Sequence, residues 1–210
     1  MIAGSGETTI TESPSKRALV RRGAFEIVET LVLTVVIFFL VHTFVAQPFR
    51  VEQRSMETTL LPEQYVLVDK LTPRWAPYER GDIVVFQPPE SMGSASGAPF
   101  IKRVIGLPGD RVELEDGLVY VNGVVLDEPY LFVRRGEPDP TEPSFNGPTS
   151  WRVPDGALFV MGDHRSASAD SREFGPIETS TVLGRALLRY WPFDTFGPIE
   201  RPAYPELVST

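Results

Sequence analysis

The stretch FIKRVIGLPGDRVELEDGLVYVNGVVL, residues 100–126, decides the fold class of this chain. Its second half consists of short apolar runs separated by Asp116-Gly117 and Asn122-Gly123. An Asp-Gly or Asn-Gly pair between two apolar runs is the strongest short-range signal for a β-hairpin, because these residues accept the positive φ that a tight turn needs. The sequence therefore predicts a hairpin or a small meander over residues 111–126.

Short β-branched runs of the same kind recur on both sides of this stretch. They predict strands at YVLVDKL (65–71), DIVVF (82–86), FIKRVI (100–105), ALFVMGD (157–163) and TVLGRALLRYWP (181–192). From residue 47 onward we find no long stretch with helical periodicity, apart from a turn or two near 176–182. The predicted class is mainly β, with a mostly antiparallel β-sheet domain over residues 47–210.

Two stretches of this domain lack periodicity. Residues 87–99 form a Gly, Ser and Pro-rich loop, and residues 137–150 are a longer Pro-rich segment. We interpret the second as a surface insertion within the domain and not as a linker between domains.

Ahead of the β-rich part lies an apolar run, Thr30–Ala46, without acids or lysines. As a helix it is about 26 Å long, and residues 24–29 extend it to the ~30 Å of a hydrocarbon core. The sequence thus predicts a transmembrane anchor over 24–46. A cleavable signal peptide and a buried core helix are the alternatives, which the long apolar core and the lack of an amphipathic stripe disfavour.

Residues 1–23 form a polar tail that carries a basic cluster of Lys16, Arg17, Arg21 and Arg22. Basic residues next to an anchor favour the cytoplasmic side. We therefore expect a single-pass cell-membrane protein with a cytoplasmic N-terminus and an extracytoplasmic β-rich domain.

The composition excludes several classes of function. The formal net charge of −8 disfavours a nucleic-acid partner, the absence of cysteine excludes thiol chemistry, and two histidines make a zinc site improbable. We expect neither a metal nor a cofactor.

Lys102 is the most unusual residue of the predicted core. Alternation along a strand puts it on one face with Phe100 and Val104, and Arg103 on the other. A lysine among apolar neighbours must be paired, reach water or give up its proton. A lysine at a sheet edge that reaches water is the commoner case, and the residues of this strand leave the choice open.

Two further polar segments stand out, and each holds a candidate for the chemistry. Ser55 follows the apolar run closely, and a serine attacks an amide only when a base takes its proton. His164, in the segment MGDHRSASADSREFGPI (161–177), is the one histidine available for a Ser-His-Asp triad. Its charged neighbours favour an ordinary surface residue, and a neutral lysine is the other available base.

Four ordered segments together resemble the type I signal peptidases, membrane-bound Ser/Lys peptidases that remove signal peptides. The segments are SMETTLLPEQYVLVDK, RGDIVVF, KRVIGLPGD and GDHRSASADSREFGPI, and the resemblance runs from the apolar run to about Pro192.

The resemblance implies roles for individual residues. Ser55 would be the nucleophile, Lys102 the general base, and Ser168 the serine that orients the lysine. Asp163, Arg165, Asp170 and Arg172 would be structural charges that pair with one another and fix the site.

Three residues depart from the family's pattern. Thr58 stands where a proline or a small residue is usual, and His164 replaces an asparagine. Gln53 stands where many members have a serine that helps the oxyanion hole, so its amide is a candidate donor that could equally point away. We expect shallow substrate pockets lined by Val51, Gln53, Met56 and strand residues near Phe100.

By the resemblance, the chain is a serine endopeptidase that removes N-terminal signal peptides from exported preproteins. Preproteins and the lipid bilayer are the expected partners, and the secretion machinery is an optional further one. A self-cleaving Ser/Lys peptidase of the repressor type and a catalytically dead, membrane-tethered binding module are the alternatives.

Overall fold

The computed structural model describes residues 16–89, 92 and 97–207. Its contacts divide the chain into two units, Met1–Thr43 and Phe44–Thr210. The boundary thus lies three residues before the one expected from the sequence.

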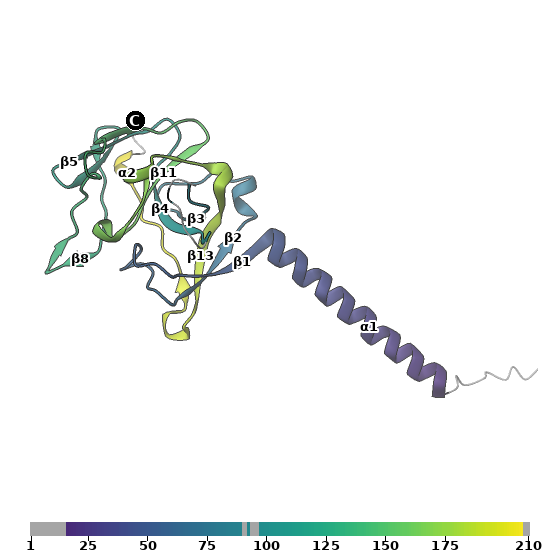
Figure 1. Ribbon diagram of the computed structural model, residues 1–210. Coiled ribbons are helices and arrows are strands. Elements are labelled where there is room, and N and C mark those ends of the chain that lie inside the picture. Colours follow the sequence, from purple (N-terminus) through teal and green to yellow (C-terminus); the bar gives the residue numbers. More distant parts are fainter. Residues whose placement is uncertain (1–15, 90–91, 93–96, 208–210) are drawn as a thin grey trace, which may run out of the picture. The chain divides into compact units, whose positions relative to one another are not determined.

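The N-terminal unit contains helix α1 (Lys16–Leu40), drawn in purple to blue in Figure 1, which continues into the π-helix η1 (Val41–Val45). Large apolar side chains of α1 between Phe25 and Leu40 are exposed. Among the described residues, no helix combines the length and the apolar character needed to cross a membrane. The expected anchor over 24–46 is thus not identified, and Ala46, its last expected residue, already begins a strand.

The second unit is built on an eight-stranded antiparallel sheet, which confirms the predicted class. Strands β2, β13, β3, β4 and β11 form its centre (Figure 1). The order across the whole sheet is β1 (Ala46–Arg50), β2 (Tyr65–Asp69), β13 (Val182–Trp191), β3 (Ile83–Phe86), β4 (Phe100–Gly106), β11 (Ala157–Met161) and β12 (Ile177–Glu178). The eighth strand, β14 (Gly197–Pro198), pairs with β13.

The predicted meander forms a second, smaller sheet. Its order is β10 (Ser150–Arg152), β5 (Arg111–Glu115), β6 (Leu118–Val121) and β7 (Val124–Val125). Both turns have positive φ at both central residues, 51° and 76° at Asp116-Gly117 and 53° and 80° at Asn122-Gly123. These are the values of type I′ turns, so each hairpin is formed by the residues that predicted it.

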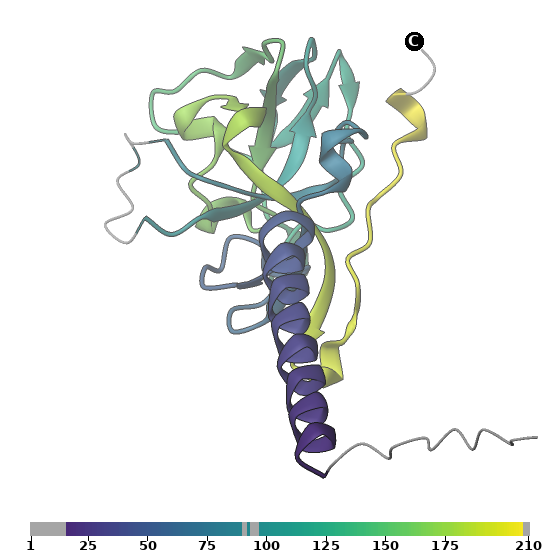
Figure 2. The same cartoon turned by 90° about the vertical axis from the view of Figure 1, so that its right-hand side faces the viewer.

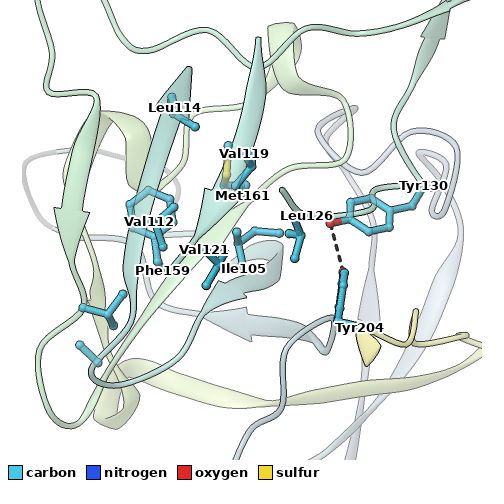
Figure 3. Close-up of a cluster of buried hydrophobic side chains, with 12 residues drawn as sticks. Ile105, Val112, Leu114, Val119, Val121, Leu126, Tyr130, Phe159, Met161 and Tyr204 are labelled. Atoms are coloured by element: carbon cyan, nitrogen blue, oxygen red, sulfur yellow. Dashed lines mark hydrogen bonds between the residues drawn. The ribbon is translucent and has the colours of Figure 1, made fainter. Parts of the chain in front are cut away.

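Apolar side chains join the two sheets. Ile105 of β4 and Phe159 of β11 pack with Val112 and Val121 of the small sheet, and all four are fully buried (Figure 3). A separate cluster packs Val51, Met56 and Leu60 against Val66, Val85 and Ile101 of the main sheet. This second cluster fixes the segment that contains Ser55.

The remaining elements are short. Helix α2 (Ser171–Phe174) is capped by Asp170, whose carboxylate accepts from the Arg172 backbone N–H. The 3₁₀ turns are η2 (Thr72–Arg74), η4 (Arg165–Ala167), η5 (Thr179–Thr181), η6 (Phe193–Thr195) and η7 (Pro205–Leu207). Turn η5 is the helical turn predicted near 176–182. After β14 the chain runs extended to η7, drawn in yellow in Figure 2.

The Pro-rich segment 137–150 is only in part a surface feature. Its Phe145 is 96% exposed, and its first two residues, β9 (Glu137–Pro138), pair with β8 (Val133–Arg134). Asp139 and Thr141, by contrast, are buried. The Asp139 carboxylate accepts from the Ser166 backbone N–H at 2.7 Å, so the segment also supports the loop after β11.

Candidate active site

Lys102 lies in the middle of β4, opposite Val84 of β3, and its side chain is completely buried. Phe100 and Val104 belong to one apolar cluster, and Ile101 belongs to another. The two faces of the strand therefore alternate as predicted. Strand β11 ends at Met161, opposite Arg103, so the chain leaves the sheet just where β4 reaches Lys102.

The ammonium nitrogen of Lys102 lies 2.8 Å from Ser55 Oγ and 3.1 Å from the carbonyl oxygen of Ile101. It also lies 5.0 Å from the centroid of the Phe100 ring. Burial lowers the pKa of Lys102 from 10.5 to about 8, because removal from water disfavours the charged form. The carboxylates of Asp170 and Asp163 oppose this effect, and the Arg172 charge adds to it.

Ser55 belongs to a tight turn between β1 and β2 and is 2% exposed. Within the turn the Glu57 N–H donates to the Arg54 carbonyl (3.0 Å), and the Leu60 N–H donates to the Met56 carbonyl (2.7 Å). Met56 and Leu60 are fully buried, so the turn is anchored by its two apolar side chains, with the exposed Thr58 between them. We call residues 54–60 the serine turn.

Thr58, in the same turn, has a φ of 91°. A β-branched residue is strained in this region, and the ring of a proline, which holds φ near −65°, would not fit there. The absence of the family's proline is therefore consistent with the backbone of this turn.

Gly162 follows the last residue of β11 and packs against the serine turn. A Cβ atom on this residue would lie 2.5 Å from the carbonyl oxygen of Ser55 and 2.3 Å from Ser168 Oγ. No side chain fits at such distances. The glycine therefore permits the close approach of the two segments that carry Ser55 and Ser168.

Asp170 organises the loop that contains Ser168. Its carboxylate accepts from Ser168 Oγ (2.7 Å), from the Gly162 N–H (3.0 Å) and from the Arg172 guanidinium (2.8 and 2.9 Å). These donors, the Arg172 guanidinium first, hold the pKa of the buried Asp170 below its usual value despite desolvation. The structure thus brings Ser168 close to the Ser55 carbonyl, while its own hydroxyl donates to Asp170.

The predicted structural charges are all buried, but only Asp170 and Arg172 pair with each other. Asp163 forms a two-pronged ion pair with Arg103 (2.8 and 2.7 Å) and accepts from Thr59 Oγ1 (2.5 Å). Arg165 pairs with Glu128. Because Arg103 and Glu128 lie 60 and 37 residues away in sequence, no local pattern indicates these pairs, although a buried strand position for Arg103 requires a partner.

The expectation that His164 is a surface residue is wrong, because its side chain is 8% exposed. Its Nδ1 lies 2.8 Å from Glu57 Oε2, and its ring stacks on Phe132 with centroids 3.9 Å apart. Its Nε2 is buried and has no hydrogen-bond partner among the described residues. Neither ring nitrogen bonds Ser55, so the structure does not assemble a Ser-His-Asp triad.

Gln53 is exposed and lines a cavity of about 230 Å³. Val51, Val66, Val85 and Ile101 contribute apolar lining, so the cavity adjoins both the segment that leads into the serine turn and strand β4. Met56, which we expected in this lining, is instead fully buried below the turn. A larger cavity of about 500 Å³ is lined by residues that include Thr59, Arg103 and Arg189, and neither Ser55 nor Lys102 lies in the wall of either cavity.

The family model and the similar proteins that we compared with this chain point to the same family. The family model described as "Signal peptidase, peptidase S26" matches residues 24–191. The Synechocystis protein named "Probable signal peptidase I-2" is 37% identical over 94% of this chain and 85% of its own length. Signal peptidase I of Bacillus licheniformis is 35% identical over 83% of this chain and 92% of its own length. Signal peptidase I of Bacillus caldolyticus is 39% identical over 73% of this chain and 84% of its own length. With the family model covering most of the sequence, the chain belongs to the signal peptidases of family S26.

Proposed function

We propose that the chain is a serine endopeptidase that removes N-terminal signal peptides from exported preproteins, with Ser55 as nucleophile and Lys102 as general base. The observation that carries the proposal is the 2.8 Å contact between Lys102 Nζ and Ser55 Oγ inside an apolar environment. A buried lysine with a pKa of about 8 is neutral in about one molecule in ten at pH 7, several hundredfold more often than a lysine with the ordinary pKa of 10.5. Only the neutral amine can accept a proton from the serine.

The reaction follows from these two groups. As Ser55 Oγ attacks the scissile carbonyl, its proton passes to Lys102 Nζ, and the resulting ammonium then protonates the leaving amine of the mature protein. Water next attacks the acyl-enzyme ester, gives a proton to Lys102 and releases the signal peptide with a free carboxylate. The lysine returns its proton to Ser55 Oγ, so the cycle leaves the enzyme unchanged.

For the oxyanion we propose the Ser55 backbone N–H as the main donor. One donor of this kind contributes about 10²–10³ in rate. Gln53 lies two residues away, and its exposed amide is a candidate second donor.

The cavity beside Gln53 is the proposed site for the residues that precede the cut. Its volume of about 230 Å³ and its valine and isoleucine lining suit small side chains, as in the Ala-x-Ala sites of signal peptides.

We further propose that the chain acts at a membrane and that the exposed apolar side chains of α1 contact lipid. The sidedness expected from the basic cluster, with residues 1–23 in the cytoplasm and the peptidase unit outside, stays a prediction.

The test is cleavage of a preprotein with an Ala-x-Ala site by the detergent-solubilised full chain. Wild type should cut after the second alanine, whereas Ser55→Ala and Lys102→Ala should each lose at least 10³-fold in rate while remaining folded. Lys70→Ala is the matched control, because the Lys70 ammonium donates to Gln47 Oε1 at 3.3 Å and touches neither Ser55 nor Lys102, so the variant should keep full activity. Activity in either dyad variant would refute the dyad, and an inactive but folded wild type would favour the tethered binding module.

A further inference from the structure

His164 is a buried polar side chain to which the proposed reaction gives no role. It lies in the loop after β11, and its backbone N–H donates to the carbonyl oxygen of Ser55 at 3.0 Å. Its side chain reaches the same turn two residues further on, at Glu57. His164 therefore hydrogen-bonds the serine turn at two points, Ser55 and Glu57, one on each side of Met56.

The surroundings of Glu57 decide which atom donates the hydrogen bond between His164 and Glu57. Arg54 Nε donates to Glu57 Oε1 at 2.6 Å, and this bond, followed by that of His164, holds the pKa of Glu57 below its usual value. An ionised carboxylate only accepts hydrogen bonds, so His164 Nδ1 must carry the proton between them. Glu57 is the charged group that contacts the imidazole from the serine turn, and Arg54 pairs with it. On the loop of His164 itself, Asp163 is engaged by Arg103.

The imidazole has a fixed orientation. Phe132 stacks on it at an interplanar angle of 19°, and the Phe132 N–H donates to the Asp163 carbonyl at 3.1 Å. A ring held in this way cannot swing toward Ser55 Oγ without breaking both the stack and the bond to Glu57. The imidazole therefore hydrogen-bonds Glu57 of the serine turn and not the hydroxyl of Ser55.

We propose that His164 is a positioning residue for Ser55: by donating Nδ1–H to Glu57 it fixes the serine turn at the distance from which Ser55 Oγ meets Lys102. The inference rests on the proposed function. Misplacement of a reacting group by about 1 Å can cost roughly 10²-fold in rate. Loss of this side-chain bond, with the backbone bond to Ser55 kept, should cost about tenfold.

The experiment compares His164→Leu with His164→Asn in the detergent-solubilised full chain. Leucine keeps apolar contact with Phe132 but has no donor, whereas the amide nitrogen of asparagine can occupy the place of Nδ1. We expect His164→Leu to lower kcat about tenfold with KM within twofold of wild type, and His164→Asn to stay within threefold of wild-type kcat. Equal kcat for leucine and wild type, or equally poor asparagine and leucine variants, would overturn the proposal.

A double-mutant cycle with Glu57→Ala tests the same contact from the turn. The loss in kcat for Glu57→Ala with His164→Leu should be close to that of Glu57→Ala alone, because both substitutions remove the same His164–Glu57 bond and Glu57→Ala also removes the bond from Arg54. Additive losses would contradict the pairing. Glu113→Ala, which removes a carboxylate from the exposed pair with Arg111, is the matched control and should be silent.

Two further readings separate the failure of this inference from the failure of the proposed function. Wild type must cleave and Ser55→Ala must not, which tests the function alone. Thermal unfolding of every variant gives the folded fraction, and a kcat loss that merely follows this fraction would assign His164 a structural role and overturn the proposal.

Discussion

Among the single residues, Lys102 is brought close to its reactive, neutral form by the burial that disfavours its charge. Its ammonium has an apolar ring at 5.0 Å and one carbonyl as a neutral acceptor. The two nearby carboxylates, Asp163 and Asp170, are each engaged by their own arginine. Desolvation therefore outweighs their attraction, and the pKa of Lys102 falls to about 8.

This pKa predicts the pH dependence of cleavage. Below pH 8 the neutral fraction of Lys102 falls tenfold for each pH unit, and above it the fraction saturates. We expect kcat/KM to rise with pH up to about 8 and then level off, measured with a peptide that carries no titrating side chain. A profile that is flat between pH 6 and 10 would contradict a titrating lysine base.

The same burial predicts that Lys102 costs stability. Its pKa is lower in the folded than in the unfolded chain, so between pH 8 and 10.5 the unfolded chain binds more protons and stability rises with pH. At pH 7 the full cost is present. Lys102→Met should therefore raise the free energy of unfolding at pH 7 by on the order of 1–3 kcal/mol, while cleavage is lost.

Urea unfolding of the Lys102→Met variant and wild type at pH 7 and pH 10.5 measures this cost. The difference between the two proteins should shrink at the higher pH, where the wild-type lysine is neutral in the folded chain. A variant less stable than wild type at pH 7 would show that the lysine is satisfied as an ammonium.

At the scale of elements, the end of β11 determines how closely the serine turn approaches the sheet. Gly162→Ala would place a methyl group 2.5 Å from the Ser55 carbonyl oxygen, which is backbone and cannot rotate away. We expect a loss of about 1–3 kcal/mol in the free energy of unfolding and at least tenfold in kcat, because the turn itself must shift.

Gly197→Ala is the control for this substitution, since its added Cβ would meet no atom within 4 Å. Both variants are compared with wild type by thermal unfolding and by preprotein cleavage. Unchanged kcat in Gly162→Ala would mean that the close approach does not set the position of Ser55.

How far the sequence predicts these elements depends on how local their causes are. The I′ turns at Asp116-Gly117 and Asn122-Gly123 and the face of β4 that carries Lys102 were predictable, because turn chemistry and alternation act within a few residues. Strand β1 was missed because Ala46–Arg50 has no apolar alternation and forms by pairing with β2.

The candidate site was predictable in part for the same reason. The resemblance singled out Ser55 and Lys102, which lie within hydrogen-bond distance. The partners of Arg165 and His164 are Glu128 and Glu57, which folding brings from distant segments, so charged neighbours in sequence suggested an exposed His164 where the structure buries it.

At the scale of the whole molecule, the division after Thr43 separates a helical unit from one that contains the complete β fold and both proposed catalytic residues. The three apolar clusters draw all their buried members from Val51–Tyr204. Within the second unit β1 pairs with β2, and the Lys70 N–H that follows β2 donates to the Val45 carbonyl just ahead of β1 at 3.0 Å.

This division predicts that residues 44–210 keep their fold and chemistry when residues 1–43 are removed, but lose efficiency at a lipid surface. The shortened chain should unfold within about 2 °C of the full chain's peptidase unit and cleave a soluble Ala-x-Ala peptide within threefold of its kcat/KM. With a preprotein held in lipid vesicles we expect at least a tenfold loss, because the exposed apolar side chains of α1 no longer bring the enzyme to the surface. Ser55→Ala in the shortened chain controls for contaminating peptidases, and equal rates on vesicle-bound preprotein would show that α1 makes no such contribution.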